Sequence, residues 1–332
     1  MWKRWQFWLG AGISVIFLAI ALRGLHLPDL WETIKSARYG WIIPGVIVYF
    51  FAVWARVWRW HYLLRKIKPI PVREMWAPVV IGYMGNNVYP FRAGEVIRAY
   101  VLKKNQLVSV SASVATILVE RIFDGLVMLV FVLVALPTVP NLPLWLKQTV
   151  IYASVLFFGA LIFLILWAVN PQLAEKIYTF FINRFVPQKL RAPLLGMAHN
   201  FSQGLGSLRS TGDVVMVFVT SVVIWLLETV KYWFVMHAFN FAVSFFALML
   251  MNGVVNLATT LPSAPGYIGT FDGPGIEVLK VFGVSPVIAT GYTLVLHAAL
   301  WLPITLLGFW YMAKESMSWH EFTQAAESRN SE

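Results

Sequence analysis

Six apolar runs dominate this chain, and each is long enough to cross a lipid bilayer as a helix. A spanning helix needs about 20 predominantly apolar residues, so the runs predict several membrane crossings. Charged residues make up 12% of the chain, whereas soluble domains contain about 25%. We therefore expect an all-α polytopic membrane protein. The runs lie at about residues 5–26, 40–62, 110–136, 148–169, 213–240 and 286–312.

A polar stretch at residues 82–104 interrupts this apolar pattern. The apolar entry at residues 76–83 is too short to span a bilayer, and Gly85, Pro90 and Gly94 follow it. Because these residue types interrupt helices, we predict two half-helices joined by a loop. Irregular backbone at membrane depth is tolerated only where it is buried in protein or lines a wet cavity. The polar residues expected at this cavity are Asn86, Asn87, Arg92 and Glu95.

A second stretch about 172 positions later resembles the first, since Pro262 and Gly266 repeat the spacing of Pro90 and Gly94. We predict two repeat units, each with a broken hairpin. The competing interpretation is that glycine and proline recur by chance in apolar chains. The units lie at about residues 40–137 and 213–312, and their hairpins at about 74–104 and 246–282.

Lysine and arginine are distributed unevenly over the segments between the runs. If the amino terminus is cytoplasmic, the outer segments contain only Lys35, Arg38, Lys147 and Lys280. Positive residues near membrane helices favour the cytoplasmic side, so we expect both termini in the cytoplasm. The same bias accounts for the net charge of +11, and we expect no nucleic-acid partner.

This topology predicts that the two repeat units are inverted, because three runs separate the helices that precede the hairpins. Each hairpin would then enter from a different face, and the two would meet near the midplane. Inverted repeats with discontinuous helices are typical of secondary transporters, whose site lies where the broken elements meet. We expect six transmembrane helices with two re-entrant hairpins, or eight if both hairpins cross fully.

Residues 171–212 form the only sizeable polar insertion in the chain. Their pattern predicts an amphipathic helical segment on the cytoplasmic membrane surface. Neither this insertion nor the polar tail is large enough for a catalytic domain. We therefore expect residues 1–332 to form a single transmembrane domain.

Glu120, Arg121 and Asp124 lie inside an apolar run, where ionisable side chains are costly and are functional candidates. They could form a cation or proton site, or a buried ion network that holds their helix against the first hairpin. Glu228 and Lys231 form a similar pair in the fifth run, with the same two interpretations.

Four further charged residues have a predicted position or role. Arg92 and Arg98 flank the start of a half-helix, and guanidinium groups with helix amides suit a lipid phosphate. The alternative for both is the positive-inside bias alone. Asp272 follows a glycine-rich turn in the second hairpin and is a further candidate for substrate binding. For Arg59, near the end of the second run, we expect the side chain to reach the lipid headgroups.

Several classes of chemistry have no support in the sequence. The chain contains no cysteine, which excludes disulfides and thiol catalysis. It lacks a phosphate-binding Gly-x-x-x-x-Gly-Lys-Ser/Thr loop, a His-Glu-x-x-His zinc motif and a Gly-x-Ser-x-Gly nucleophile motif. We therefore expect neither a cofactor nor a bound metal, and no enzymatic activity.

Four short motifs resemble those of the lysylphosphatidylglycerol synthase transmembrane-region family, also called flippase-like integral membrane proteins. The resemblance covers nearly the whole chain, and the Pro-x-Arg-Ala-Gly-Glu run is its most specific part. The motifs are Arg59-Trp60, Asn87-x-x-Pro90-x-Arg92-Ala93-Gly94-Glu95-x-x-Arg98, Glu120-Arg121-x-x-Asp124 and Pro262-x-x-Pro265-Gly266-x-x-Gly269.

This resemblance implies a lipid flippase or lipid transporter of a bacterial or archaeal inner membrane. Its partner would be a membrane lipid with an anionic phosphate headgroup. Members that act on lysyl lipids carry an aminoacyl transferase domain after this region, and aminoacylation is not expected here. The alternative is an accessory subunit or enzyme that acts on lipid-linked intermediates together with a partner enzyme.

Overall fold

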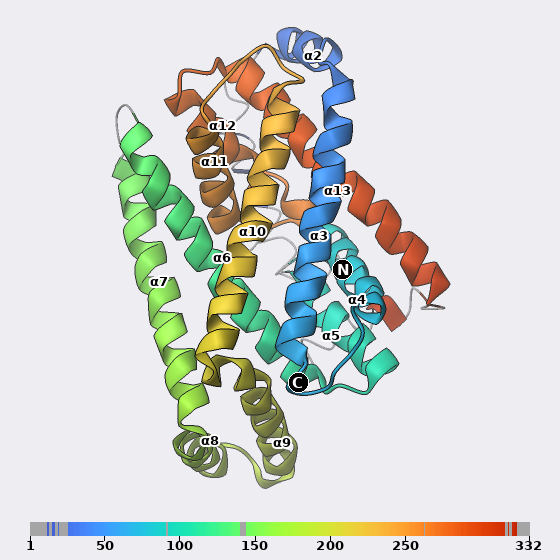
Figure 1. Ribbon diagram of the computed structural model, residues 1–332, viewed down its shortest axis with the longest axis vertical. Helices are drawn as coiled ribbons and strands as arrows, with labels where there is room; N and C mark the ends of the chain where they lie inside the picture. The colour runs from blue at the N-terminus through green and yellow to red at the C-terminus, as the bar shows by residue number, and fades with distance from the viewer. Residues whose placement is uncertain are drawn as a thin grey trace.

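The structure is a computed structural model that describes residues 26–90, 92–139, 144–261 and 263–315, with residues 12, 15, 16, 19, 318 and 321–323. Within these residues the protein consists of helices and connecting turns, without a strand (Figure 1). The expectation of an all-α polytopic membrane protein is confirmed. The first predicted run, at residues 5–26, lies almost entirely outside the described residues.

Four helices are long and apolar enough to cross a membrane. A fifth, α6 (Val110–Ala135), has 26 residues but carries three charged side chains in its middle. At about 1.5 Å per residue its length also suffices for a crossing. The four apolar helices are α3 (Ile42–Leu64), α7 (Leu144–Val169), α10 (Thr211–Met236) and α13 (Pro286–Lys314).

Both predicted broken hairpins are present as pairs of shorter helices. Figure 1 shows the first pair toward the end of the molecule that carries α8 (Pro171–Phe185), and the second pair toward the end that carries α2 (Leu27–Lys35). The hairpins therefore occupy opposite halves of the structure. Hairpin one consists of α4 (Val72–Val88) and α5 (Ala93–Gln106), and hairpin two of α11 (Phe245–Ala258) and α12 (Asp272–Val281).

Helices α3 and α10, which precede the two hairpins, pack together in antiparallel directions. Arg56 contacts Glu228, and further along α3 Arg59 contacts Ser221. The residue numbers of the partners therefore fall along α10 as they rise along α3. The inverted repeat requires this arrangement, although the repeat itself stays a prediction.

Glycine explains how closely the two halves of hairpin one pack. A Cβ atom on Gly94 would lie 1.8 Å from the backbone oxygen of Gly82, and one on Gly85 would lie 2.8 Å from the Cα of Gly94. Backbone therefore meets backbone between α4 and α5. The turn between them ends at Arg92, which adopts a left-handed conformation with φ of 53°.

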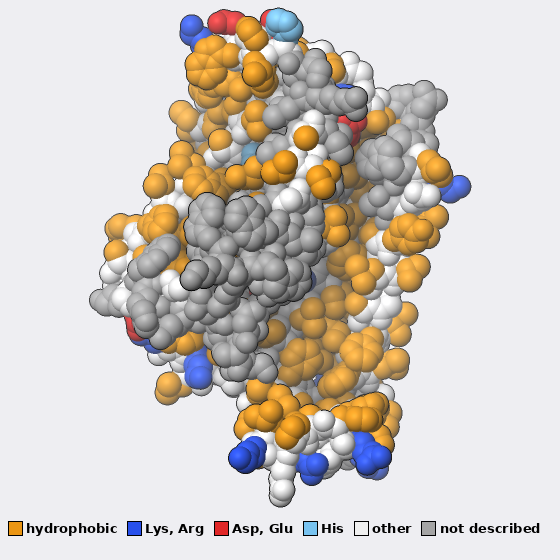
Figure 2. All heavy atoms as spheres, turned by 180° about the vertical axis from the view of Figure 1, so that it is seen from behind, with side chains coloured by type: hydrophobic (Ala, Val, Ile, Leu, Met, Phe, Trp, Pro, Cys, Tyr) orange, Lys and Arg blue, Asp and Glu red, His pale blue; other side chains and the backbone are white. Residues whose placement is uncertain are grey.

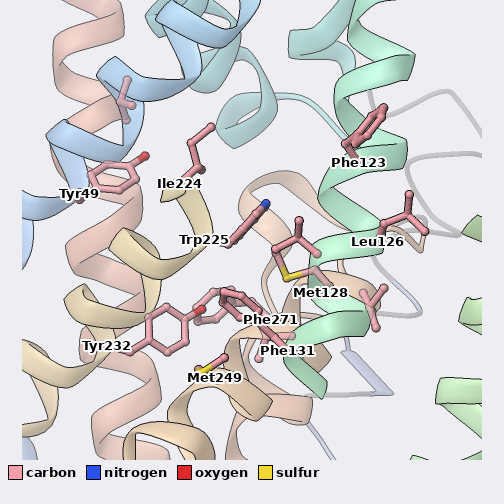
Figure 3. Packing of buried hydrophobic residues seen from close by; sticks show 14 of the residues in the cluster. Tyr49, Phe123, Leu126, Met128, Phe131, Ile224, Trp225, Tyr232, Met249 and Phe271 are labelled. Carbon is pink, nitrogen blue, oxygen red and sulfur yellow. The ribbon is translucent and has the colours of Figure 1, made fainter. Parts of the chain in front are cut away.

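The buried core lies between α3, α6, α10 and hairpin two, while α7 lies at the edge. Figure 3 shows Trp225 of α10 beside Met128 of α6 within this core. By contrast, the most apolar part of α7 has only 6% of its residues buried. Phe157 of α7 packs against Gly125 of α6, where a Cβ atom would lie 2.0 Å from the phenylalanine ring.

The polar insertion forms α8 and α9 (Gln188–Gly204), followed by the short helix η3 (Leu205–Arg209). One face of α8 exposes large apolar side chains, with Phe180 63% and Phe185 71% exposed. Figure 2 shows hydrophobic side chains above a lower rim of Lys and Arg at this end of the molecule. The insertion is therefore helical and amphipathic, and its place on the cytoplasmic surface stays a prediction.

Candidate functional site

Three cavities meet in the middle of the molecule, and Arg92 and Arg121 line all three. We call them the polar pocket (about 130 Å³), the lateral groove (about 420 Å³) and the hairpin cavity (about 340 Å³). Arg92 comes from the turn of hairpin one and Arg121 from the middle of α6. Two cations from separate elements therefore stand at the junction of the cavities.

The polar pocket lies between the turns of the two hairpins and the middle of α3, α10 and α13. Its described lining contains four cationic side chains and one carboxylate, which makes it strongly positive. Asn86 and Asn87 also line it, as predicted for the polar residues of the first hairpin. The charged lining residues are Arg56, Arg92, Arg121, Lys231 and Glu228.

The lateral groove is lined mainly by apolar side chains of α6, α7, α10 and α11. Two of them, Leu156 and Phe163, are 62% and 56% exposed on the outer side of the molecule. Trp225 and Asn256 line both the groove and the polar pocket. The apolar groove is therefore continuous with the charged pocket, and its outer side faces the region where lipid chains would lie.

Trp225 lines both compartments and is held by polar contacts. Its Nε1 donates a hydrogen bond to Asp124 Oδ1 at 2.8 Å, and the guanidinium of Arg56 lies 5.0 Å from its ring centre. Asn252 Nδ2 donates to the Trp225 carbonyl at 3.2 Å. This tryptophan thus contacts charged side chains of α3 and α6 while it lines the groove.

Asp124 is paired mainly with an arginine from another helix. Arg59 Nη1 lies 2.6 Å from Asp124 Oδ1 and 2.5 Å from the Ser221 hydroxyl oxygen. Arg59 is only 1% exposed, so its predicted extension to the lipid headgroups is wrong. A guanidinium fork that meets a buried carboxylate on both oxygens is a strong and directional pair, which outweighs the pull of the headgroup layer.

Glu120 is fully buried and is held by hairpin one. Arg98 Nη2 lies 2.5 Å from Glu120 Oε2, and the guanidinium of Arg98 lies 4.2 Å from the centre of the Trp60 ring. Arg59 Nε lies 3.7 Å from the other oxygen of Glu120. Arg98 lines none of the three cavities, and its contacts favour a structural role over phosphate binding.

Arg121 lies among three carboxylates without a short contact to any of them. Its nitrogens are 3.4 Å from Asp124, 3.5 Å from Glu95 and 3.9 Å from Glu120. These distances exceed the roughly 2.7–2.9 Å of a charge-assisted hydrogen bond. Its Nε is buried and has no hydrogen-bond partner among the described residues. The Arg121 side chain is 26% exposed, so a ligand in the cavities could compete with these weak contacts for its guanidinium.

Arg92 joins the two hairpins. Its Nη2 donates to the carbonyl oxygen of Thr259 at 3.1 Å, at the carboxyl end of α11, and its Nη1 lies 3.5 Å from Glu95. The ring centre of Tyr267 lies 5.6 Å from its guanidinium. A cation near the end of a helix is favoured by the helix dipole. Glu95 itself lines the hairpin cavity.

A second group of charges lies between α3 and α10. Glu228 contacts Arg56 at 2.7 Å on one oxygen and Lys231 on the other, and all three side chains are buried. Glu95, Glu120, Asp124 and Glu228 thus each have at least one cation close by. These contacts favour the interpretation of a buried ion network, while proton coupling through these residues stays a prediction.

Asp272 lies behind the polar pocket, against one of its lining residues. His297 Nδ1 is 2.8 Å from Asp272 Oδ1, and His297 Nε2 is 2.7 Å from the carbonyl oxygen of Gly266. The other oxygen of Asp272 accepts a hydrogen bond from the backbone of Gly269. Asp272 thus stabilises the turn of hairpin two and does not itself line the described cavities.

Sequence reasoning missed Trp225 and Asn256 as parts of the site. Nothing distinguishes Trp225 in a chain with 16 tryptophans, because its position depends on how α10 packs against α6. Asn256 is a polar residue in an apolar half-helix, and it lies shortly before the second hairpin turn. This position could have indicated a place in the site, because the polar residues before the first hairpin turn are predicted to line a cavity.

Residues 7–308 match the family described as Lysylphosphatidylglycerol synthase TM region. The chain belongs to this family. It is similar to a UPF0104 membrane protein from Methanothermobacter thermautotrophicus, with 23% identity over 91% of this chain and 90% of that protein. A UPF0104 membrane protein from Methanocaldococcus jannaschii is 20% identical over 90% of this chain and 91% of its own length.

A third relative carries a different name. The glycosyltransferase AglD from Haloferax volcanii is 25% identical over 79% of this chain. The match covers 47% of that protein, so the chain spans about half of its length. Together with the family, these relatives indicate a multi-pass membrane protein of a lipid-related family.

Proposed function

We propose that the protein moves a membrane lipid with an anionic phosphate headgroup between the two leaflets. The observation that carries this proposal is the position of Arg92 and Arg121, where the apolar lateral groove meets the positive polar pocket. A lipid has the same division into an apolar chain and a polar head. The groove would take a chain from the bilayer while the pocket takes the head.

Arginine suits the proposed headgroup contact because its planar fork binds a phosphate through two parallel hydrogen bonds. Arg121 makes only long contacts to carboxylates, and Arg92 is bound to a neutral carbonyl that a phosphate could replace. The opposed hairpins would expose the site to one side at a time, as in transporters with inverted repeats. The same proposal places the protein in the inner membrane of a bacterium or archaeon, with both termini in the cytoplasm.

The test measures leaflet exchange in vesicles that contain the purified protein and a fluorescently labelled lipid, either phosphatidylglycerol or phosphatidic acid. Arg121→Ala should slow exchange about 10-fold to 100-fold, since a hydrogen bond to a charged group contributes about 1.5–3 kcal/mol. Arg121→Lys should restore it only in part, because the fork is lost. Lys189→Ala on α9, remote from the cavities, is the control and should exchange lipid like wild type.

Folding of Arg121→Ala is checked by its melting temperature in detergent. Asp124 and Glu120 keep Arg59 and Arg98 as partners in this variant, so it should remain folded. If folded Arg121→Ala exchanges lipid at the wild-type rate, the proposed headgroup contact is wrong. If the wild-type protein exchanges neither phosphatidylglycerol nor phosphatidic acid, the transport proposal itself fails.

A second candidate function follows from the relative named a glycosyltransferase, of which this chain matches about half. The protein would then be the membrane part of a system that modifies lipid-linked intermediates, with catalysis supplied by a partner. Copurification of an enzyme, together with absence of exchange by the isolated protein, would favour this function.

A further inference from the structure

We infer that the polar pocket selects a lipid whose head is a phosphate monoester, which carries close to two negative charges. This inference rests on the proposed function for the placement of the lipid chain in the lateral groove. The preference for a doubly charged phosphate rests on the charges, contacts and size of the pocket itself.

The first observation is the charge balance of the cluster around the pocket. Among the described residues, six cationic side chains face four carboxylates, so two positive charges are unbalanced. The cations are Arg56, Arg59, Arg92, Arg98, Arg121 and Lys231, and the carboxylates are Glu95, Glu120, Asp124 and Glu228.

The neighbouring Asp272 and His297 do not change this balance. Both ring nitrogens of His297 face oxygen atoms, one of Asp272 and one of Gly266. Two hydrogen bonds require either a protonated imidazole beside a carboxylate or a neutral imidazole beside a carboxylic acid. In both cases the pair has no net charge.

Burying unbalanced charge is costly, so a ligand that neutralises it should bind strongly. The excess charge faces the pocket, because four of the cations line it and Glu228 is its only carboxylate among the described lining residues. A phosphate monoester carries about −1.5 to −2 charges at neutral pH. The diester of a common phospholipid carries a single negative charge and would leave one positive charge unbalanced.

The volume of the polar pocket also favours a phosphate monoester. Its volume is about 130 Å³, and one water molecule needs about 10–15 Å³ by the same measure. The pocket therefore holds roughly ten water-sized positions, which suits a bare phosphate better than a head extended by glycerol or an amino acid. The chain would leave past Arg121 and Trp225, which line both the pocket and the lateral groove.

The experiment compares binding of three probes to the purified protein in detergent. The probes are dioleoyl phosphatidic acid, a monoester; dioleoyl phosphatidylglycerol, a diester with the same chains; and inorganic phosphate. At about pH 7.5, where the monoester carries close to two negative charges, phosphatidic acid should bind at least about tenfold more tightly than phosphatidylglycerol. Near pH 5.5 the preference should shrink, because the monoester then loses a charge and the diester does not.

Two variants test the role of charge. Lys231→Gln removes one positive charge and should reduce the preference for the monoester. The double variant Glu228→Gln with Lys231→Gln restores the net charge of the cluster and should restore the preference. Both are compared only as folded proteins, judged by melting temperature and by retained phosphatidylglycerol binding.

Equal affinity for the two lipids at about pH 7.5 would overturn the inference, whatever the variants do. Inorganic phosphate that binds as tightly as phosphatidic acid would show a site for free phosphate, and the assignment to a lipid would fall. Leaflet exchange without monoester preference would leave the proposed function intact and remove only this inference. Monoester preference without leaflet exchange would leave this inference intact and contradict the proposed function.

Discussion

Hairpin one and hairpin two lie in opposite halves of the structure, and different contacts hold them in place. Hairpin one is fixed by backbone contact between α4 and α5 at Gly94 and by the ion pair of Arg98 with Glu120. Hairpin two has a wider turn whose contact to α13 is the hydrogen-bonded pair of Asp272 and His297.

The difference indicates how each hairpin contributes to the site. Charge pairs and close backbone packing hold Arg92, at the turn of hairpin one, in a defined position. Hairpin two supplies neutral groups around the same pocket, namely the Thr259 carbonyl that Arg92 binds and the ring of Tyr267. Hairpin one therefore contributes a charge to the pocket, and hairpin two contributes neutral groups near that charge.

The largest expected effect is on the side of the membrane from which each hairpin can be labelled. The chain has no cysteine, so Leu107→Cys at the end of α5 and Lys280→Cys in the last turn of α12 can be labelled selectively. We expect an impermeant thiol reagent to label position 107 only from the cytoplasmic side and position 280 only from the other. Arg73→Cys and Leu144→Cys are controls for the two sides. Labelling of positions 107 and 280 from one side would remove the inverted repeat.

The next effect compares the forces that hold the hairpins. Arg98→Gln leaves the buried Glu120 without its closest partner and should cost about 3–5 kcal/mol of unfolding free energy. Asp272→Asn can keep the hydrogen bonds to His297 and Gly269 with a neutral amide, so it should cost less than about 1.5 kcal/mol. Thermal unfolding in detergent measures both. Equal losses would show that hairpin two is also held by charge.

The smallest expected effect is the loss of unfolding free energy when a glycine in a hairpin is replaced by alanine. Gly94→Ala places a methyl group against the Gly82 backbone, which cannot move aside without shifting α4, and should cost about 1–3 kcal/mol. Gly275→Ala in α12 meets the flexible end of Met251 at 2.7 Å instead. It should cost clearly less, and Gly159→Ala, with open space around it, is the control. If the unfolding temperatures of Gly94→Ala and Gly275→Ala match, backbone contact does not distinguish the hairpins.

Some of the contacts between charged residues could be predicted from their spacing along one helix. Lys231 meets Glu228, and Arg121 lies 3.4 Å from Asp124, as expected for residues three positions apart on a helix. The shorter contact of Asp124 is to Arg59, which is 65 positions away in the chain. Since Arg59 lies near the end of an apolar run, its sequence position predicted contact with lipid headgroups instead.

The sequence by itself determined the membrane character, the helices and the two interruptions that form the hairpins. Hydropathy, proline and glycine act over a few residues, so these features need no knowledge of distant partners. Only the tertiary structure decided which charged residues form pairs, such as Arg98 with Glu120. It also decided that Arg92 and Arg121 lie where an apolar groove reaches a positive pocket. These features depend on the packing of α3, α6, α10 and the hairpins, which brings together residues as far apart as Arg56 and Glu228, 172 positions along the chain.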